Sequence, residues 1–167
     1  MGLPGKLSIK WSSCPTGDHN RAKGKAGYPT LAFQCITDFN HRVIGIFGPQ
    51  YGTRNDKEIV KVDPNVHRIR TGWFKDVLWS YYTCAGRIEQ ERGAYLICDN
   101  GYHRWPISIS PYANADCASL EGYFSTNLES IRKDVECTFG ILKKHWRILN
   151  DGLHYRDIQA CEKIWRS

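Results

Sequence analysis

The sequence predicts a single α/β domain. Short apolar segments bounded by turn residues indicate strands at 7–11, 29–38, 42–47 and 94–98. Residues 130–144 carry apolar side chains at helical spacing and indicate a long helix. The chain has 167 residues, which suits one domain and is long enough to bury a sizeable core. We therefore expect one sheet with helices packed against it.

The composition favours a soluble, basic, intracellular protein. The net charge is +6 and the isoelectric point is about 9.0, which favours an acidic partner, nucleic acid first. No apolar run approaches the roughly 18 residues that a membrane span needs, and the first residues do not resemble a secretory signal. Seven scattered cysteines without a CxxC pair favour free, buried thiols in a reducing compartment. We expect a nuclear or cytoplasmic location.

A basic loop follows the first predicted strand. Arg21, Lys23 and Lys25 put three positive charges within five residues, after a turn-forming segment at 14–20. Two interpretations stay open: the loop contacts phosphates of a nucleic acid, or it is a solvated surface loop.

The middle of the chain predicts a hairpin, a capped helix and an aromatic helix. Residues 29–38 and 42–47 form the hairpin. Asn55 and Glu58 resemble a helix cap, so Asp56 either helps to satisfy the free amides of that helix or assists a metal ion. Aromatic and apolar residues between 73 and 82 recur at helical spacing, and we interpret them as core in preference to a platform for stacked bases.

Two acids stand out in the second half. Asp99 ends a buried apolar strand, and Glu136 lies at the edge of the apolar stripe of the long helix. A capping box of Thr126 and Glu129 precedes that helix, and Gly140 within it suggests a close backbone approach. The two acids can converge on one divalent cation, as a metal-dependent enzyme that cleaves phosphodiesters requires. Carboxylate ligands suit Mg²⁺ or Mn²⁺.

Four motifs follow one another in the order seen in Harbinger/PIF-type DDE transposases. They are YPTLAFQ (28–34), GTRNDK (52–57), CDNGY (98–102) and RKDVECTFGILK (132–143). The chain resembles the catalytic domain of that family over residues 2–165, so we treat residues 1–167 as one DDE nuclease-like domain. The resemblance implies an RNase H-like mixed sheet flanked by helices. It also implies a D-D-E triad in which Asp99 matches the second acid and Glu136 the third.

The chain departs from that family in two ways. The segment 6–13, where the family carries its first catalytic aspartate, contains no acid, and Asp18 lies on the following loop. No helix-turn-helix module precedes the domain, so recognition of DNA ends would need other DNA-binding parts or a Myb-like partner protein. We therefore interpret the chain as N-terminally truncated.

The sequence thus predicts a divalent-metal-dependent DNA endonuclease or transposase domain that is catalytically impaired. Its catalytic and metal-binding residues would be Asp99 and Glu136, with Asp56 as a further candidate ligand. Its DNA contacts would come from basic residues in the first loop and on the long helix, namely Arg21, Lys23, Lys25, Arg132, Lys143 and Lys144. The alternative is a non-catalytic, transposon-derived module that binds nucleic acid or protein through this basic face.

Overall fold

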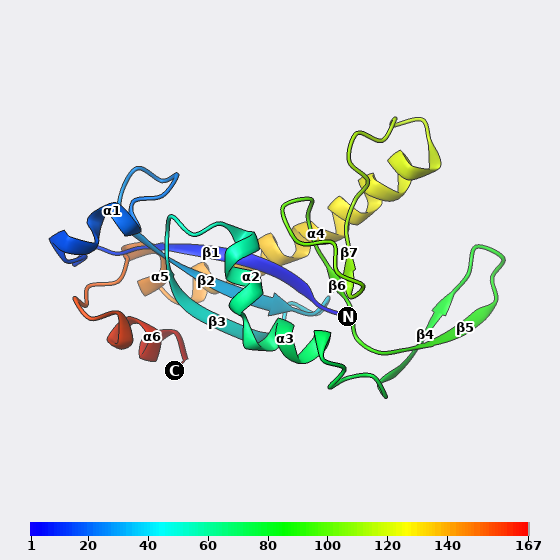
Figure 1. Cartoon of the computed structure of the whole chain (residues 1–167), viewed down its shortest axis with the longest axis horizontal. Coiled ribbons are helices and arrows are strands. Elements are labelled where there is room, and N and C mark those ends of the chain that lie inside the picture. Colours follow the sequence, from blue (N-terminus) through cyan, green and yellow to red (C-terminus); the bar gives the residue numbers. More distant parts are fainter. Residues whose placement is uncertain (167) are drawn as a thin grey trace.

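The computed structural model describes residues 1–166 as a mixed α/β domain (Figure 1). Its centre is an antiparallel sheet in the order β1-β2-β3, with β1 at Leu3–Lys10, β2 at Thr30–Thr37 and β3 at Val43–Tyr51. All eight residues of β2 are buried, because this middle strand is covered on both faces. The predicted hairpin over 29–47 is confirmed as β2 and β3.

A second pair of strands continues the sheet beyond β1. Strand β6, at Leu96–Ile97, pairs in parallel with β7, at Ser108–Ile109. A parallel bridge joins Gly2 to Leu96, in which the Gly2 amide donates to Tyr95 O (3.1 Å) and the Ile97 amide donates to Gly2 O (2.9 Å). The strands therefore follow one another in the order β3-β2-β1-β6-β7, with β6 and β7 parallel to β1.

Helices cover both faces of this sheet (Figure 1). One face packs against α4 at Leu120–His145, α5 at Ile148–Asp151 and α6 at Ile158–Arg166. The other face packs against α2 at Asp56–Val62 and α3 at Pro64–Arg70. A short 3₁₀ turn, η1 at Thr16–Asp18, leads into α1 at His19–Ala22.

Alternation along β1 assigns its side chains to these two faces. Leu3, Leu7 and Ile9 are buried against the helices on the α4 side, whereas Lys6 and Ser8 alternate with them and line a pocket with residues of α2. The strand begins earlier than its apolar pattern at 7–11 indicates. Leu3 extends the buried alternation toward the N-terminus, and Gly5 falls on the same face.

Helix α4 begins earlier than predicted. Its N-cap is Ser119, whose Oγ accepts a hydrogen bond from the Gly122 amide (3.0 Å). Thr126 lies inside the helix and donates its hydroxyl to Gly122 O, so the predicted capping box was wrong. A Cβ on Gly140 would meet nothing within 4 Å, so a close packing contact does not explain that glycine.

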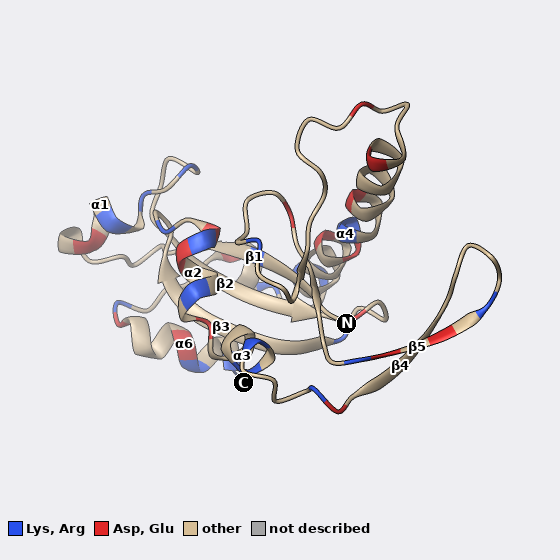
Figure 2. Ribbon diagram, turned by 45° about the vertical axis from the view of Figure 1, so that its right-hand side comes forward, with Lys and Arg blue, Asp and Glu red and all other residues tan. Residues whose placement is uncertain are grey.

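The aromatic segment forms no helix. Strands β4, at Leu78–Tyr82, and β5, at Ile88–Arg92, make an antiparallel hairpin that projects from the body of the domain (Figures 1 and 2). Trp73 is 70% exposed and Tyr82 is 77% exposed, so the prediction that this run is core was wrong. The spacing that resembled a helix comes from a turn followed by a strand.

The cysteines of the chain are free thiols. Cys35, Cys98 and Cys161 are buried, whereas three others are exposed on the surface at positions 84, 117 and 137. The prediction that most of the thiols are buried therefore holds for only some of them. No helix within residues 1–166 is long and apolar enough to cross a membrane.

Candidate functional site

Three carboxylate side chains line one cavity of about 210 Å³ between the sheet, α2 and α4. Asp56 is the first residue of α2, Asp99 follows β6, and Glu136 lies near the middle of α4. The structure thus brings together the two predicted catalytic acids and the third candidate ligand. The remaining lining residues include two cations and a glycine, namely Lys6, Arg132 and Gly5.

Asp99 is held by contacts on both carboxylate oxygens. Its Oδ1 accepts a hydrogen bond from the Gly101 amide (2.7 Å), which closes the turn after β6. Its Oδ2 forms an ion pair with Arg132 Nη2 (3.1 Å), one turn before Glu136 on α4. Arg132 was predicted to contact nucleic acid, but in this structure its guanidinium contacts an acid of the site.

Asp56 faces a lysine. The Lys6 ammonium lies 2.6 Å from Asp56 Oδ1, and both side chains are only partly exposed. The cap of this helix is the preceding residue, because Asn55 Oδ1 accepts a hydrogen bond from the Glu58 amide (2.9 Å). The predicted cap at Asn55 is confirmed. Asp56 instead forms an ion pair with Lys6 of β1.

Gly5 and Asp99 line the same cavity. The parallel bridge between Gly2 and Leu96 joins β1 to β6, and each of these two residues lies three positions beyond that bridge, with Asp99 just after the end of β6. A Cβ built on Gly5 would point toward α4, 2.7 Å from Val135 Cγ2 and 3.0 Å from the Phe139 ring. Strand β1 therefore offers no side chain at the point of the cavity where a further carboxylate could join Asp99 and Glu136.

The charges in this cavity largely offset one another. Three carboxylates face two cations, Lys6 and Arg132, and each cation is paired with one acid. Within residues 1–166 no three His, Cys, Asp or Glu side chains are grouped so that they could hold a metal ion. The side chains present therefore do not fit a site for two divalent ions, because only Glu136 among the three acids is not ion-paired within the described part of the chain.

Two buried groups next to the acids stay protonated. Burial raises the pKa of the Tyr102 hydroxyl well above its usual range, and the nearby negative charge of Asp56 adds to the increase. Burial also raises the pKa of the Cys98 thiol to about 12. Neither group can therefore act as an anionic ligand or a base near neutral pH, which leaves the chemistry to the three carboxylates.

A polar pocket adjoins the acidic cavity. It shares Lys6 and Asp56 with that cavity and adds Lys25 and Arg54. The sequence predicted a role for Lys25 but not for Lys6 or Arg54, since only the fold brings β1 next to the loop before α2. The alternation of apolar and polar residues along β1 was the signal that could have placed Lys6 on this face.

The other predicted basic residues do not line this polar pocket. The Arg21 guanidinium sits 5.7 Å from the centroid of the Tyr51 ring, and Lys23 follows α1. Lys143 and Lys144 lie in the last turn of α4, where positive charge also complements the helix dipole. Figure 2 shows that lysines and arginines are spread over several elements of the domain.

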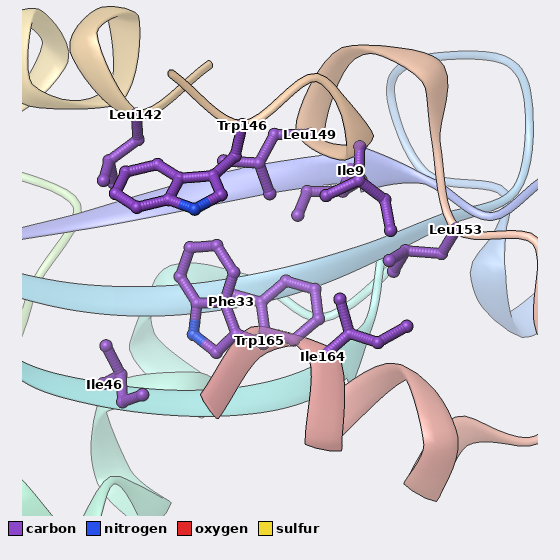
Figure 3. A pocket seen from close by; sticks show the side chains of 10 residues that line it. Ile9, Phe33, Ile46, Leu142, Trp146, Leu149, Leu153, Ile164 and Trp165 are labelled. Carbon is purple, nitrogen blue, oxygen red and sulfur yellow. The ribbon is translucent and has the colours of Figure 1, made fainter. Parts of the chain in front are cut away.

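A separate cavity of about 240 Å³ lies between the sheet and α4 to α6 (Figure 3). Its walls are apolar, and they include Phe33, Trp146 and Trp165. The Phe33 and Trp165 rings pack with their centroids 4.7 Å apart. Among residues 1–166, no titratable side chain lines this cavity, so these residues offer it no group for acid–base or metal chemistry.

The fold and the site together define a mixed α/β domain with clustered acids beside a basic pocket. The family model described as plant transposon protein matches residues 2–167. The chain therefore belongs to this family and is derived from a transposon, which indicates a transposase-related function. No curated protein and no solved structure matches the chain.

Proposed function

We propose that this chain is a DDE-type nuclease domain, of the Harbinger/PIF kind, that binds DNA but cleaves it poorly or not at all. The observation that carries the proposal is the composition of the acidic cavity. The two acids that we propose for a DDE site, Asp99 and Glu136, line this cavity together with Gly5 of β1, and Asp56 and Asp99 are each ion-paired with a cation of the chain.

The strand arrangement supports an RNase H-like assignment. That fold has a mixed sheet flanked by helices. The order β3-β2-β1-β6-β7 has this pattern, with helices on both faces. In this arrangement Asp99 follows β6, the strand next to β1. Glu136 lies on α4, and both acids line the same cavity.

Impaired cleavage follows from the charges of the cavity. Mg²⁺ or Mn²⁺ would supply electrostatic activation of a water or a 3′-hydroxyl, and Asp99 and Glu136 are the residues we propose as ligands of one ion. Arg132 competes with such an ion for Asp99, because its guanidinium already pairs with Oδ2. Gly5 adds no carboxylate, and the Lys6 ammonium beside Asp56 opposes a second cation in the same cavity.

DNA binding depends on different residues. Lys6, Lys25 and Arg54 surround the pocket next to the acids, where they can contact phosphates without any metal ion. We propose that the other basic residues predicted from the sequence make additional contacts with the DNA backbone. They are Arg21, Lys23, Arg132, Lys143 and Lys144. Phosphate contacts carry no sequence information, so a Myb-like partner protein is the proposed source of sequence recognition.

A plasmid-nicking assay tests the nuclease proposal. The purified chain is incubated with supercoiled DNA and Mn²⁺, next to an Asp99→Ala variant. We expect no nicking above that of the variant. Nicking that requires Mn²⁺ and disappears in Asp99→Ala would show an intact active site and overturn the proposal of impairment.

The second candidate function is a non-catalytic binding module, and it is favoured by the pairing of Lys6 and Arg132 with the acids. DNA binding that weakens steeply with salt and is unchanged by EDTA would support this function. Lys25→Gln should weaken such binding, whereas Lys75→Gln, an exposed lysine in the turn before β4, serves as the matched control. A chain that binds no DNA under low salt would leave a protein partner as the remaining form of this function.

A further inference from the structure

The β4–β5 hairpin is a sheet of its own with two open edges. Its strands pair only with each other among the described residues, in a register that sets Leu78 opposite Arg92 and Ser80 opposite Gln90. The hairpin projects away from the domain in both views (Figures 1 and 2). An isolated two-stranded ribbon is at best marginally stable in water, so an additional strand on either edge would stabilise it.

The hydrogen bonds at the two ends of the hairpin show which backbone groups point away from the partner strand. The Gly93 amide donates to Val77 O (2.9 Å), and the Thr83 amide donates to Arg87 O (2.8 Å). Hydrogen-bonded and non-hydrogen-bonded pairs alternate along an antiparallel ladder. The odd-numbered residues of β4 therefore bond to β5. The N–H and C=O groups of the even-numbered residues point outward along the open edge, and these residues are Leu78, Ser80 and Tyr82.

The two edges differ in charge. Strand β4 has the sequence LWSYY, without a charged residue or a proline, whereas β5 has the sequence IEQER. Soluble proteins usually protect open edges with charged residues, prolines or short strands. The β5 edge carries such charges at Glu89, Glu91 and Arg92, but the β4 edge does not.

The β4 sequence is complementary to itself. We propose that β4 pairs antiparallel with β4 of a second copy of this chain, around a two-fold axis at Ser80. This register sets Ser80 opposite Ser80 and Leu78 opposite Tyr82, which are the residues whose backbone groups point outward. A continuous four-stranded sheet β5-β4-β4-β5 then joins the two copies.

Side chains on both faces support this register. Tyr82 is 77% exposed and Leu78 is 52% exposed, and the pairing places each beside the other across the axis. On the opposite face, Trp79 would lie across from Tyr81 of the second copy, extending an aromatic contact in which these two rings are 5.5 Å apart within one chain. Antiparallel pairing also places each domain body beside the tip of the other hairpin.

The same arrangement at the β5 edge is unfavourable. Pairing of β5 with itself around Gln90 would set Glu89 opposite Glu91 of the second copy on both sides of the axis. Like charges directly opposite each other destabilise a strand pair. The sequence therefore directs self-association to β4 and away from β5.

Sedimentation velocity over a wide range of protein concentration tests the proposal. Reductant is included because Cys84 at the hairpin tip and two other cysteines are exposed and could link copies by disulfides. The interface consists of two short strands, so we expect a reversible dimer that dissociates on dilution. A chain that stays monomeric at every concentration would overturn the proposal.

Proline substitutions locate the interface. Ser80→Pro removes an N–H that points to the open β4 edge, so it should abolish the dimer without breaking the hairpin ladder. Gln90→Pro removes the corresponding N–H on the β5 edge and is the matched control, expected to leave the dimer intact. Loss of the dimer in Gln90→Pro, or its survival in Ser80→Pro, would contradict the proposed register.

A charge-swap experiment tests the two-fold axis itself. Ser80→Lys and Ser80→Glu each place like charges opposite each other in a homodimer, so each variant alone should be monomeric. A mixture of the two places opposite charges across the axis and should restore the dimer. A mixture that stays monomeric, while the native chain dimerises, would show that Ser80 does not face itself.

Discussion

Substitution of Gly5 by alanine tests the placement of β1 against α4. In an ordinary strand this change is mildly favourable, because alanine restricts the unfolded chain. Here the added Cβ would lie 2.7 Å from Val135 Cγ2 and 3.0 Å from the Phe139 ring. Overpacking of this kind costs about 1–3 kcal/mol, so Gly5→Ala should lower the free energy of unfolding by that amount. Urea denaturation followed by circular dichroism measures the change.

A double-mutant cycle separates the clash from other effects. Val135→Ala alone removes two buried carbon atoms from a residue that is 2% exposed, at a cost of about 2 kcal/mol. Because it also removes the nearest obstacle, Gly5→Ala should cost less in the Val135→Ala background, with a coupling of about 1 kcal/mol or more. Ser8→Ala, on the exposed face of β1, is the matched control and should change stability by less than about 0.5 kcal/mol. Strictly additive effects would refute the contact between Gly5 and α4.

Three further predictions follow from single contacts. Ser119→Ala removes the N-cap of α4 and should cost about 1 kcal/mol in urea denaturation, more than Thr126→Ala. Burial raises the pKa of Cys35 and Cys98 from 9.0 to about 12, so the folded state keeps protons that the unfolded state loses. Stability should therefore fall as pH rises from about 9 to about 12, by about 1.4 kcal/mol per pH unit for each thiol, and replacing either by alanine should reduce that slope. Arg132→Gln frees Asp99 and should strengthen Mn²⁺ binding severalfold in calorimetry, whereas unchanged affinity would show that the ion pair does not limit binding.

The local features of the fold could be predicted from the sequence. The β2–β3 hairpin is encoded by two apolar runs around a turn at 38–41, and Asn55 three residues before Glu58 predicted the cap of α2. Asp99 at the end of an apolar run was correctly placed after a strand. Each of these features depends on residues that are close in the sequence. A short stretch of sequence is therefore enough to predict them.

The hairpin β4–β5 was missed because two signals compete in the same window. Apolar residues at 73, 74, 77, 78, 81 and 82 fit helical spacing, while the strand itself alternates between exposed and half-buried residues only over five positions. Gly86, with φ of 71°, makes the turn that closes the hairpin and was the available signal. Gly72, with φ of 79°, directly follows the C-cap of α3 and was a further signal that a turn separates this helix from the strand.

The organisation of the site depends on contacts between distant residues. Lys6 pairs with Asp56, which is 50 residues away in the sequence (56 − 6). Arg132 pairs with Asp99, which is 33 residues away (132 − 99). The sequence shows that residues 6–13 contain no acid. It does not show which residue of β1 lies nearest to Asp99. Only the parallel bridge from Gly2 to Leu96 identifies it as Gly5.

Calorimetric titration with Mn²⁺ shows directly whether the acidic cavity is an incomplete metal site. The native chain is compared with Gly5→Asp/Val135→Ala, which supplies a carboxylate beside Asp99 and the space for it, and both are checked for folding by circular dichroism. We predict weak or no binding by the native chain and clearly tighter binding by the double variant, with the gain lost when Asp99→Ala is added. Native binding as tight as that of the double variant, or a gain that survives Asp99→Ala, would contradict the proposal that the missing side chain at Gly5 leaves this site incomplete.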